Sequence, residues 1–181
     1  MSIYLVRHCH AMGQEPDAPL TVEGREQSLR LSSFLAQRGI VRIVSSPFKR
    51  AVDSACPLAE TLGLSIEIDE RLAERRLGLV DNGDWLSALE SSFRDLNLCL
   101  PGGESSLAAQ SRGAAVIEDV FLGTRLPAAV FSHGNILSLI AHSIDDSLGF
   151  DFWRSLSNPD VFEITRPIDQ LVLSRVWRGL I

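Results

Sequence analysis

Short apolar segments of strand type alternate with longer segments of helical type along most of this chain. The strand-type segments are rich in Val and Ile, and they span Ile3–Val6, Arg42–Ser45, Ser65–Ile68 and Ala128–Phe131. Strands that alternate with helices pair in parallel, because each helix carries the chain back across the sheet. We therefore predict an α/β fold with a mostly parallel sheet that is covered by helices on both faces.

Several of the predicted helices have recognisable ends. Thr21 is a typical N-cap for a helix that carries Glu23 in its first turn and stops near Gly39. Another helix is predicted from about Ser105 to Gly123, and a further one begins directly after His133. Polar capping residues and helix-ending glycines at these places fix the boundaries between helices and strands.

The helix after the second strand contains two prolines with different expected effects. Ser46 followed by Pro47 is typical of a cap and a first helical position, and Gly63 stands where this helix should end. Pro57 lies inside the helix and cannot donate a backbone hydrogen bond. We expect a kink or break near Cys56.

The tail has a different pattern from the rest of the chain. The stretch DVFEITRPIDQLVLSRVW, which begins at Asp160, predicts two strands joined at Pro167–Asp169, as a C-terminal antiparallel hairpin. With no linker or internal repeat, residues 1–181 are expected to form a single domain.

Residues 81–103 form a segment of separate character. Within Asp81–Leu100, apolar residues recur three or four apart, which predicts one face of a helix: Leu86, Leu89, Phe93, Leu96 and Leu100. Such a stripe usually packs on a core. A lid or wall beside a pocket is the alternative.

Composition limits the classes of function. The net charge of −6 argues against nucleic acid and anionic membranes as main partners, and no apolar run reaches the ~18 residues of a membrane span. The amino terminus does not resemble a signal peptide. Cys9, Cys56 and Cys99 have no metal-ligand spacing, so free thiols in a reducing compartment are expected. We predict a cytoplasmic protein.

Charged and imidazole side chains follow three of the predicted strands. Arg7 and His8 follow the first strand, Arg50 lies on the first helical turn after the second, and His133 follows Ala128–Phe131. Ligand sites in parallel sheets form beyond the carboxyl ends of strands. Guanidinium forks bind phosphate oxygens, and the N–H groups at a helix start such as Gly134 attract anions. The expected partner is a small phosphorylated substrate.

The remaining histidines lack this shared position. A lone histidine is more often structural than catalytic, so His10 and His142 are left out of the site. The His8-x-His10 spacing is not followed by a third ligand, and we expect no metal.

Six stretches resemble one known family in their order along the chain. They are LVRHCHA, APLTVEGREQ, IVSSPFKRAVDSA, DERLAERRLG, PGGES and FSHGN, which span residues 5 to 135. Together they are similar to the histidine phosphatase superfamily, the phosphoglycerate mutase-like proteins. The resemblance implies a three-layer α/β/α sandwich and phosphoryl transfer through a phosphorylated histidine, without a metal or organic cofactor.

The resemblance also implies roles for individual residues. His8 corresponds to the nucleophile, and Arg7, Arg50 and His133 complete the phosphate pocket. Glu74, in LAERRLG, matches the usual proton donor. Gln14 stands where many members carry an Asn that contacts phosphate.

Cys9 is a departure from the family, which usually has glycine after the histidine. The first interpretation is a small residue that is tolerated where glycine usually stands. The alternative is a thiol whose pKa is lowered by Arg7 and which has a redox role. A cysteine-dependent phosphatase would need His-Cys, five residues and then Arg, but counting past Cys9 reaches Glu15, a carboxylate that would repel phosphate.

Four functions fit the resemblance. The first is a phosphomonoesterase of histidine acid phosphatase type that acts on small metabolites. The alternatives are phosphoglycerate mutase-type phosphoryl transfer, a protein phosphohistidine phosphatase and a non-catalytic phosphate-binding sensor. The identity of the substrate and the oligomeric state stay open.

Overall fold

The computed structural model describes residues 1–80, 83–168 and 170–179. One six-stranded sheet runs through the protein in the order β3-β2-β4-β1-β5-β6. The strand bounds are Ser2–Arg7 for β1, Arg42–Ser45 for β2, Ile66–Ile68 for β3, Ala128–Ser132 for β4, Asp160–Thr165 for β5 and Val172–Arg178 for β6. All four strands predicted between residues 3 and 131 are confirmed.

The pairing of the strands also agrees with the sequence pattern. β1 is parallel to β4, β4 to β2, and β2 to β3. β5 is antiparallel to β1, and β6 is antiparallel to β5. The mostly parallel sheet and the C-terminal antiparallel hairpin are confirmed. Of the predicted turn, Asp169 lies outside the described residues.

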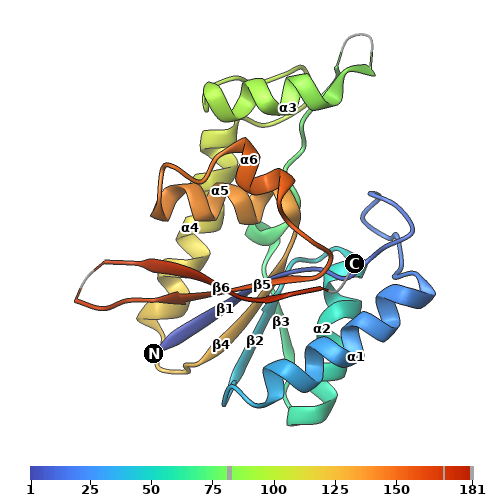
Figure 1. Cartoon of the computed structure of the whole chain (residues 1–181), viewed down its shortest axis with the longest axis vertical. Coiled ribbons are helices and arrows are strands. Elements are labelled where there is room, and N and C mark those ends of the chain that lie inside the picture. The colour runs from blue at the N-terminus through green and yellow to red at the C-terminus, as the bar shows by residue number, and fades with distance from the viewer. Residues whose placement is uncertain (81–82, 169, 180–181) are drawn as a thin grey trace.

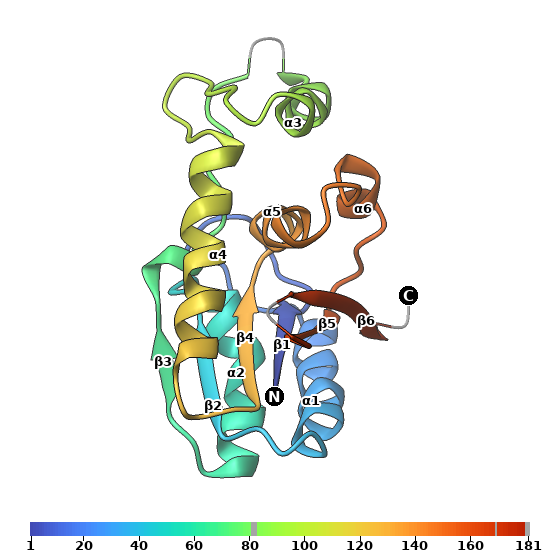
Figure 2. The same ribbon diagram turned by 90° about the vertical axis from the view of Figure 1, so that its left-hand side faces the viewer.

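Helices cover both faces of this sheet. Their bounds are Val22–Ala36 for α1, Lys49–Leu62 for α2, Glu70–Leu72 for the short 3-10 helix η1, Trp85–Arg94 for α3, Ser106–Leu122 for α4, Gly134–Ile144 for α5 and Phe150–Arg154 for α6. Figures 1 and 2 show α1 and α2 on one side of the sheet, and α4 and α5 on the other. The α/β/α sandwich is confirmed.

The alternation of side chains along β1 explains the two layers. Ile3 and Leu5 pack into the apolar cluster formed with α4 and α5, whereas Tyr4 and Val6 pack into the cluster formed with α1 and α2. Successive residues of a strand point to opposite faces, so a continuous apolar run fills two cores. Within the described residues, no helix is long and apolar enough to cross a membrane.

Most predicted helix ends are confirmed. Thr21 accepts a hydrogen bond from the N–H of Gly24 and begins α1, and Ser105 accepts one from Ala108 and begins α4. His133 is the N-cap of α5. The side-chain oxygens of Thr21 and Ser105 satisfy N–H groups that the first turn of a helix leaves free, whereas His133 makes no such bond.

The prediction for the start of α2 was wrong, and the helix has no break near Cys56. The helix begins at Lys49 after Phe48, so Ser46 is not its cap and Pro47 is not its first residue. It also runs without a break through Pro57. Its buried face of small and apolar side chains packs against α1, and this packing outweighs one missing backbone hydrogen bond.

The segment with the apolar stripe forms a shorter helix than predicted. α3 ends at Arg94, and the turn that follows is closed by a hydrogen bond from the N–H of Asn97 to Asp95 Oδ1 (3.0 Å), so Leu96 and Leu100 lie beyond the helix. Side chains of this kind compete with helical hydrogen bonds. In Figures 1 and 2, α3 stands at the end of the molecule farthest from the sheet. Residues 81 and 82 of the predicted segment lie outside the described residues.

Candidate active site

Three neighbouring parallel strands end at one edge of the sheet and bring distant residues together. The N–H of His8, just past β1, donates to Ser132 O on β4 (3.0 Å). The N–H of Ser46, just past β2, donates to Phe131 O on the other side of β4 (2.9 Å). His133 follows β4 directly. His8 and His133 therefore meet at the same edge, as the sequence predicts, and Ser46 lies beside them.

His8 is held as one neutral tautomer by its two neighbours. Nδ1 lies 2.7 Å from Cys9 O, which can only accept, so Nδ1 carries the proton. Arg50 Nε donates to Nε2 over 3.2 Å, so Nε2 presents a lone pair. Burial, with further repulsion from Arg50 and Arg7, lowers the pKa of His8 from 6.5 to about 3. The carbonyl of Cys9 thus holds the proton of His8 on Nδ1.

Arg50 lies on the first turn of α2 and is almost completely buried. Its Nη1 donates to the carbonyl oxygens of Gln14 (3.0 Å) and Glu15 (2.9 Å), and its guanidinium carbon lies 4.9 Å from the centre of the Phe48 ring. Burial lowers the pKa of this arginine, which still remains charged near neutral pH. The loop carbonyls fix a cation against the nucleophilic face of His8.

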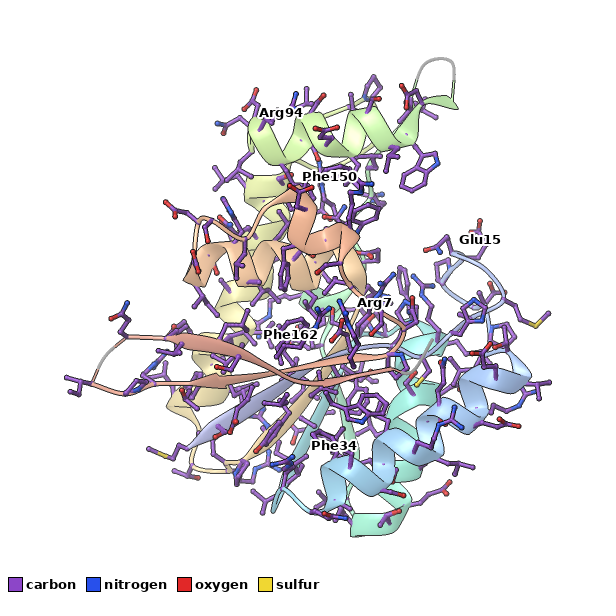
Figure 3. All side chains as sticks on the ribbon, in the orientation of Figure 1. Arg7, Glu15, Phe34, Arg94, Phe150 and Phe162 are labelled. Atoms are coloured by element: carbon purple, nitrogen blue, oxygen red, sulfur yellow. The ribbon has the colours of Figure 1, made fainter. Side chains whose placement is uncertain are left out.

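Arg7 comes to the same place from the end of β1. Its Nη1 donates to the carbonyl oxygens of Leu156 (3.1 Å) and Ser157 (3.3 Å), and its buried Nε has no partner among the described residues. Figure 3 shows Arg7 near the middle of the molecule, with Glu15 on a loop that extends outward. A Cβ at Gly134 would lie only 3.0 Å from Arg7 Nε. Glycine at this position lets the guanidinium rest against the start of α5.

His133 is completely buried and faces His8 edge-on, with 5.1 Å between the ring centres. Its Nε2 lies 2.7 Å from Ser46 Oγ, and its Nδ1 has no partner among the described residues. Burial, followed by repulsion from His8 and Arg50, puts the pKa of His133 well below 6.5. Both imidazoles of the site are therefore neutral near neutral pH.

Glu74 contacts the first turn of α5. Its Oε2 accepts a hydrogen bond from the N–H of Asn135 (3.1 Å), and its Oε1 accepts from the N–H groups of Ile136 (3.1 Å) and Arg75 (2.9 Å). A carboxylate at a helix N-terminus is favourable because free N–H groups and the helix dipole face it. This position puts an acidic group at the rim of the arginine pair.

A cavity of about 600 Å³ extends from these residues toward α3. Four of the predicted site residues line it: Arg7, Gln14, Glu74 and Gly134. Its far side, here called the outer wall, consists of Leu77, Gly78, Val80, Trp85, Leu89 and Trp153. Gln14 contributes an exposed side chain to the cavity and its backbone carbonyl to Arg50.

The outer wall joins residues of α3 and α6. The indoles of Trp85 and Trp153 meet edge-on with 6.1 Å between centres, and Trp153 stacks on Phe150 at 5.5 Å. Figure 3 shows Phe150 below α3. Of the apolar stripe, Leu89 and Phe93 join the core, and Leu89 also lines the cavity.

Of the two interpretations of Cys9, the structure agrees with the one in which the thiol packs as a small side chain. Its side chain is completely buried in the apolar cluster with α1 and α2, and burial raises the pKa of the thiol to about 12. A cysteine replaces the usual glycine without strain, because Ile168 alone among described non-glycine residues has a positive φ. Cys9 packs into the core and supplies the carbonyl that holds His8.

Four contributors to the site were missed by the sequence analysis. Arg75 lines the cavity and is 5% exposed, with its donors directed at Ser92 Oγ and Glu104 O. Asn135 lines it too, and its buried Oδ1 has no partner in the described part of the chain. Both adjoin predicted residues in sequence, which was a usable signal. Trp85 lies in residues 81–103, for which a pocket wall was the alternative, but its partner Trp153 is 68 residues away and carried no signal.

Comparison with known proteins agrees with this geometry. The chain is 30% identical over 171 residues to a probable phosphoglycerate mutase of Escherichia coli, an alignment that covers 84% of this chain and 77% of the mutase. The mycobacterial glucosyl-3-phosphoglycerate phosphatase, solved with inorganic phosphate, is similar with a TM-score of 0.79 at 23% identity, covering 98% and 97% of the two chains.

A putative α-ribazole-5′-P phosphatase of Escherichia coli K-12 is similar with a TM-score of 0.74 at 22% identity, covering 100% of this chain and 99% of that chain. These two structures share the fold of this protein. The sequence pattern of one family matches residues 3–173, which is nearly the whole chain. The protein accordingly belongs to the histidine phosphatase superfamily (branch 1), an enzyme family of phosphatases and mutases.

Proposed function

We propose that this protein is a phosphomonoesterase that hydrolyses small phosphorylated metabolites through a phosphohistidine at His8. The observation that carries the proposal is the state of His8: a buried, neutral imidazole whose Nε2 lone pair faces the guanidinium of Arg50. A neutral imidazole is nucleophilic, and a cation at its reactive face attracts the phosphoryl oxygens.

The first chemical step follows from these contacts. The entering phosphoryl group displaces Arg50 Nε from His8 Nε2 and takes the guanidinium donors on its own oxygens. Nε2 then attacks phosphorus in line with the leaving oxygen, and the bond between phosphorus and that oxygen breaks. Arg7 and Arg50 stabilise the negative charge on the equatorial oxygens in the transition state.

Glu74 is proposed as the proton donor to the leaving oxygen. In the free protein its carboxyl oxygens accept three backbone N–H groups, which hold it beside the arginine pair. Acid catalysis requires that this carboxyl hold a proton when the bond to phosphorus breaks. Glu74 then gives the proton to the departing alkoxide and takes one from the water that hydrolyses phosphohistidine.

The cavity supports a small alcohol as the leaving group. A volume of about 600 Å³ lies in the range of small-ligand sites, and the outer wall offers an apolar surface to the part of the substrate beyond the phosphate. Arg75 and Asn135 add polar groups to the same space. These features support a phosphorylated metabolite as the substrate.

Phosphoglycerate mutase-type transfer is the second candidate, favoured by the 30% identity to a probable mutase. The two functions differ in the fate of the phosphoryl group. With labelled phosphoenzyme and an excess of phosphoglycerate, the proposed phosphatase releases inorganic phosphate. Appearance of the label in the other phosphoglycerate isomer would instead establish a mutase.

Trapping of the intermediate tests the proposal. Enzyme mixed with labelled substrate and denatured during turnover should carry an acid-labile, base-stable phosphoryl group, which is absent in His8→Ala. His10→Ala is the matched control, because it removes an exposed imidazole two residues away. Loss of the adduct in His10→Ala, or its survival in His8→Ala, would refute the assignment.

A further inference from the structure

Ser46 makes a contact that neither its position before α2 nor the chemistry of the nucleophile explains. Its side chain is completely buried, and Oγ lies 2.7 Å from His133 Nε2. The same Oγ accepts a hydrogen bond from the N–H of Phe48 (3.2 Å). The hydroxyl is therefore shared between a backbone donor and one particular nitrogen of the second histidine of the site.

Counting protons determines the direction of the contact with His133. A serine hydroxyl has one proton to donate and accepts through its oxygen. If His133 Nε2 donated to Ser46, the hydroxyl proton would have no acceptor in the described part of the chain, and His133 Nδ1 would be a second unsatisfied buried atom. If Ser46 donates to Nε2, the hydroxyl is satisfied, and Nδ1, which then carries the proton, is the one atom of this pair that has no partner among the described residues. Buried polar groups avoid the first arrangement because each unpaired group costs about 1–3 kcal/mol.

We propose that Ser46 is a positioning residue that fixes His133 as the Nδ1-protonated tautomer, so that this neutral ring presents an N–H donor to the phosphoryl group. Nδ1 is the one ring nitrogen that no described residue occupies, so any contact of His133 with substrate passes through it. A bare Nδ1 lone pair would repel phosphate oxygens, which only accept. The tautomer is a property of the free protein, and only its effect on turnover rests on the proposed function.

The two histidines of the site would then hold their protons on the same nitrogen for opposite purposes. The carbonyl of Cys9 accepts from His8 Nδ1 and leaves a lone pair on Nε2 for attack. The hydroxyl of Ser46 donates to His133 Nε2 and leaves an N–H on Nδ1 for binding. The distinction lies entirely in whether the neighbouring oxygen accepts or donates.

Nitrogen-15 NMR of the imidazoles tests the tautomer directly, without substrate. The chemical shift of each ring nitrogen separates a protonated from an unprotonated atom, and the rings are assigned by substituting each of the four histidines in turn. We expect His133 to show protonated Nδ1 and unprotonated Nε2 in the wild type. In Ser46→Ala the proton should redistribute toward Nε2. Protonated Nε2 in the wild type would overturn the proposal outright.

Ser45→Ala is the matched control, because Ser45 is also completely buried but donates to Ser46 O instead of His133. Ser46→Ala should lower kcat/KM by about 10- to 100-fold and weaken vanadate inhibition in parallel. Ser45→Ala should change neither value by more than about twofold. An unchanged His133 spectrum in Ser46→Ala, or an equal loss of kcat/KM in both variants, would overturn the proposal and show that Ser46 only packs in the core.

The experiment separates this inference from the proposed function. A protein with the expected tautomer that turns over no phosphomonoester would refute the enzyme assignment and leave the role of Ser46 standing. A working phosphatase with the other tautomer would do the reverse.

Discussion

The candidate site has two sides that are built from different parts of the fold. The phosphate side comprises Arg7, His8, Arg50 and His133, which follow strand ends or begin helices at one edge of the sheet; of these four, Arg7 lines the cavity and the other three are buried beside it. The outer wall belongs mainly to α3, α6 and the segment that leads to α3, and α3 is the part of it farthest from the sheet (Figure 1). On the phosphate side the two imidazoles and Arg50 are buried, whereas Trp85 of the outer wall is 53% exposed.

This difference indicates that the two sides have different roles in the site. Strand ends are held on both sides by the sheet, so groups placed there keep the geometry that phosphoryl transfer needs. A peripheral helix can change its residues without disturbing the sheet, which suits the recognition of variable leaving groups. We expect variants of the phosphate side to affect every substrate, and variants of the outer wall to affect substrates according to their size.

Substitution of Glu74, which lies between the phosphate side and the outer wall, should have the largest effect on the rate. Glu74→Gln should slow the release of alkyl alcohols by roughly 10²–10⁴-fold, because an alkoxide must be protonated as it leaves. Phosphohistidine formation from nitrophenyl phosphate, measured as a burst, should suffer much less. Exposed Glu70 provides the control Glu70→Gln. Equal slowing of both leaving groups would make Glu74 structural and place the proton donor elsewhere.

Arg50→Lys tests the phosphate side alone. Lysine keeps a positive charge but cannot hold Gln14, Glu15 and a phosphate oxygen at once, so transition-state stabilisation should fall by roughly 2–4 kcal/mol for every substrate. Arg25→Lys, at an exposed position on α1, is the control. A kcat/KM within about threefold of the wild type would remove Arg50 from the phosphate side.

The neutral burial of His8 predicts a pH dependence of stability. Between pH 6.5 and about 3 the unfolded chain binds a proton that folded His8 does not, so the free energy of unfolding falls as the pH falls. From pH 6.5 to 4.5 this one group should lower the free energy of unfolding by about 2 kcal/mol. Urea unfolding at both pH values should show a loss smaller by about that amount in His8→Gln. The same loss in both proteins would contradict a neutral, buried His8.

Trp153→Leu gives the smallest effect and sharpens the contrast between the two sides. The loss of one ring of the outer wall should raise KM by roughly 2- to 10-fold for bulky monoesters, because this fold-change corresponds to the free energy of one aromatic contact. The KM for small monoesters should remain nearly unchanged. Trp177→Leu is matched, because Trp177 stacks on Phe34 at 5.8 Å and does not line the cavity. A uniform loss for all substrates would mean that Trp153 supports the phosphate side.

Features of the site that depend on local sequence signals could be predicted, and those that depend on contacts between residues far apart in the chain could not. Arg50 and His133 could be placed because strand and helix signals are local and parallel strands end at a common edge. The role of Ser46 could not, since its partner His133 is 87 residues away and a serine before proline has the local pattern of a cap. The role of Cys9 stayed open because Arg7, two residues away, suggested an acidic thiol, whereas the core cluster that buries the thiol is formed mainly by residues distant in the chain.

The position of the phosphoryl group on the ring of His8 tests the central claim most directly. Because Nδ1 is bound to Cys9 O and Nε2 carries the lone pair, the account predicts phosphorylation at Nε2. Phosphorus and nitrogen NMR of trapped, isotopically labelled phosphoenzyme distinguish the two positions through the coupling between phosphorus and the bonded nitrogen. A phosphoryl group on Nε2 of His8 supports the account, and one on Nδ1 or on any other residue contradicts it.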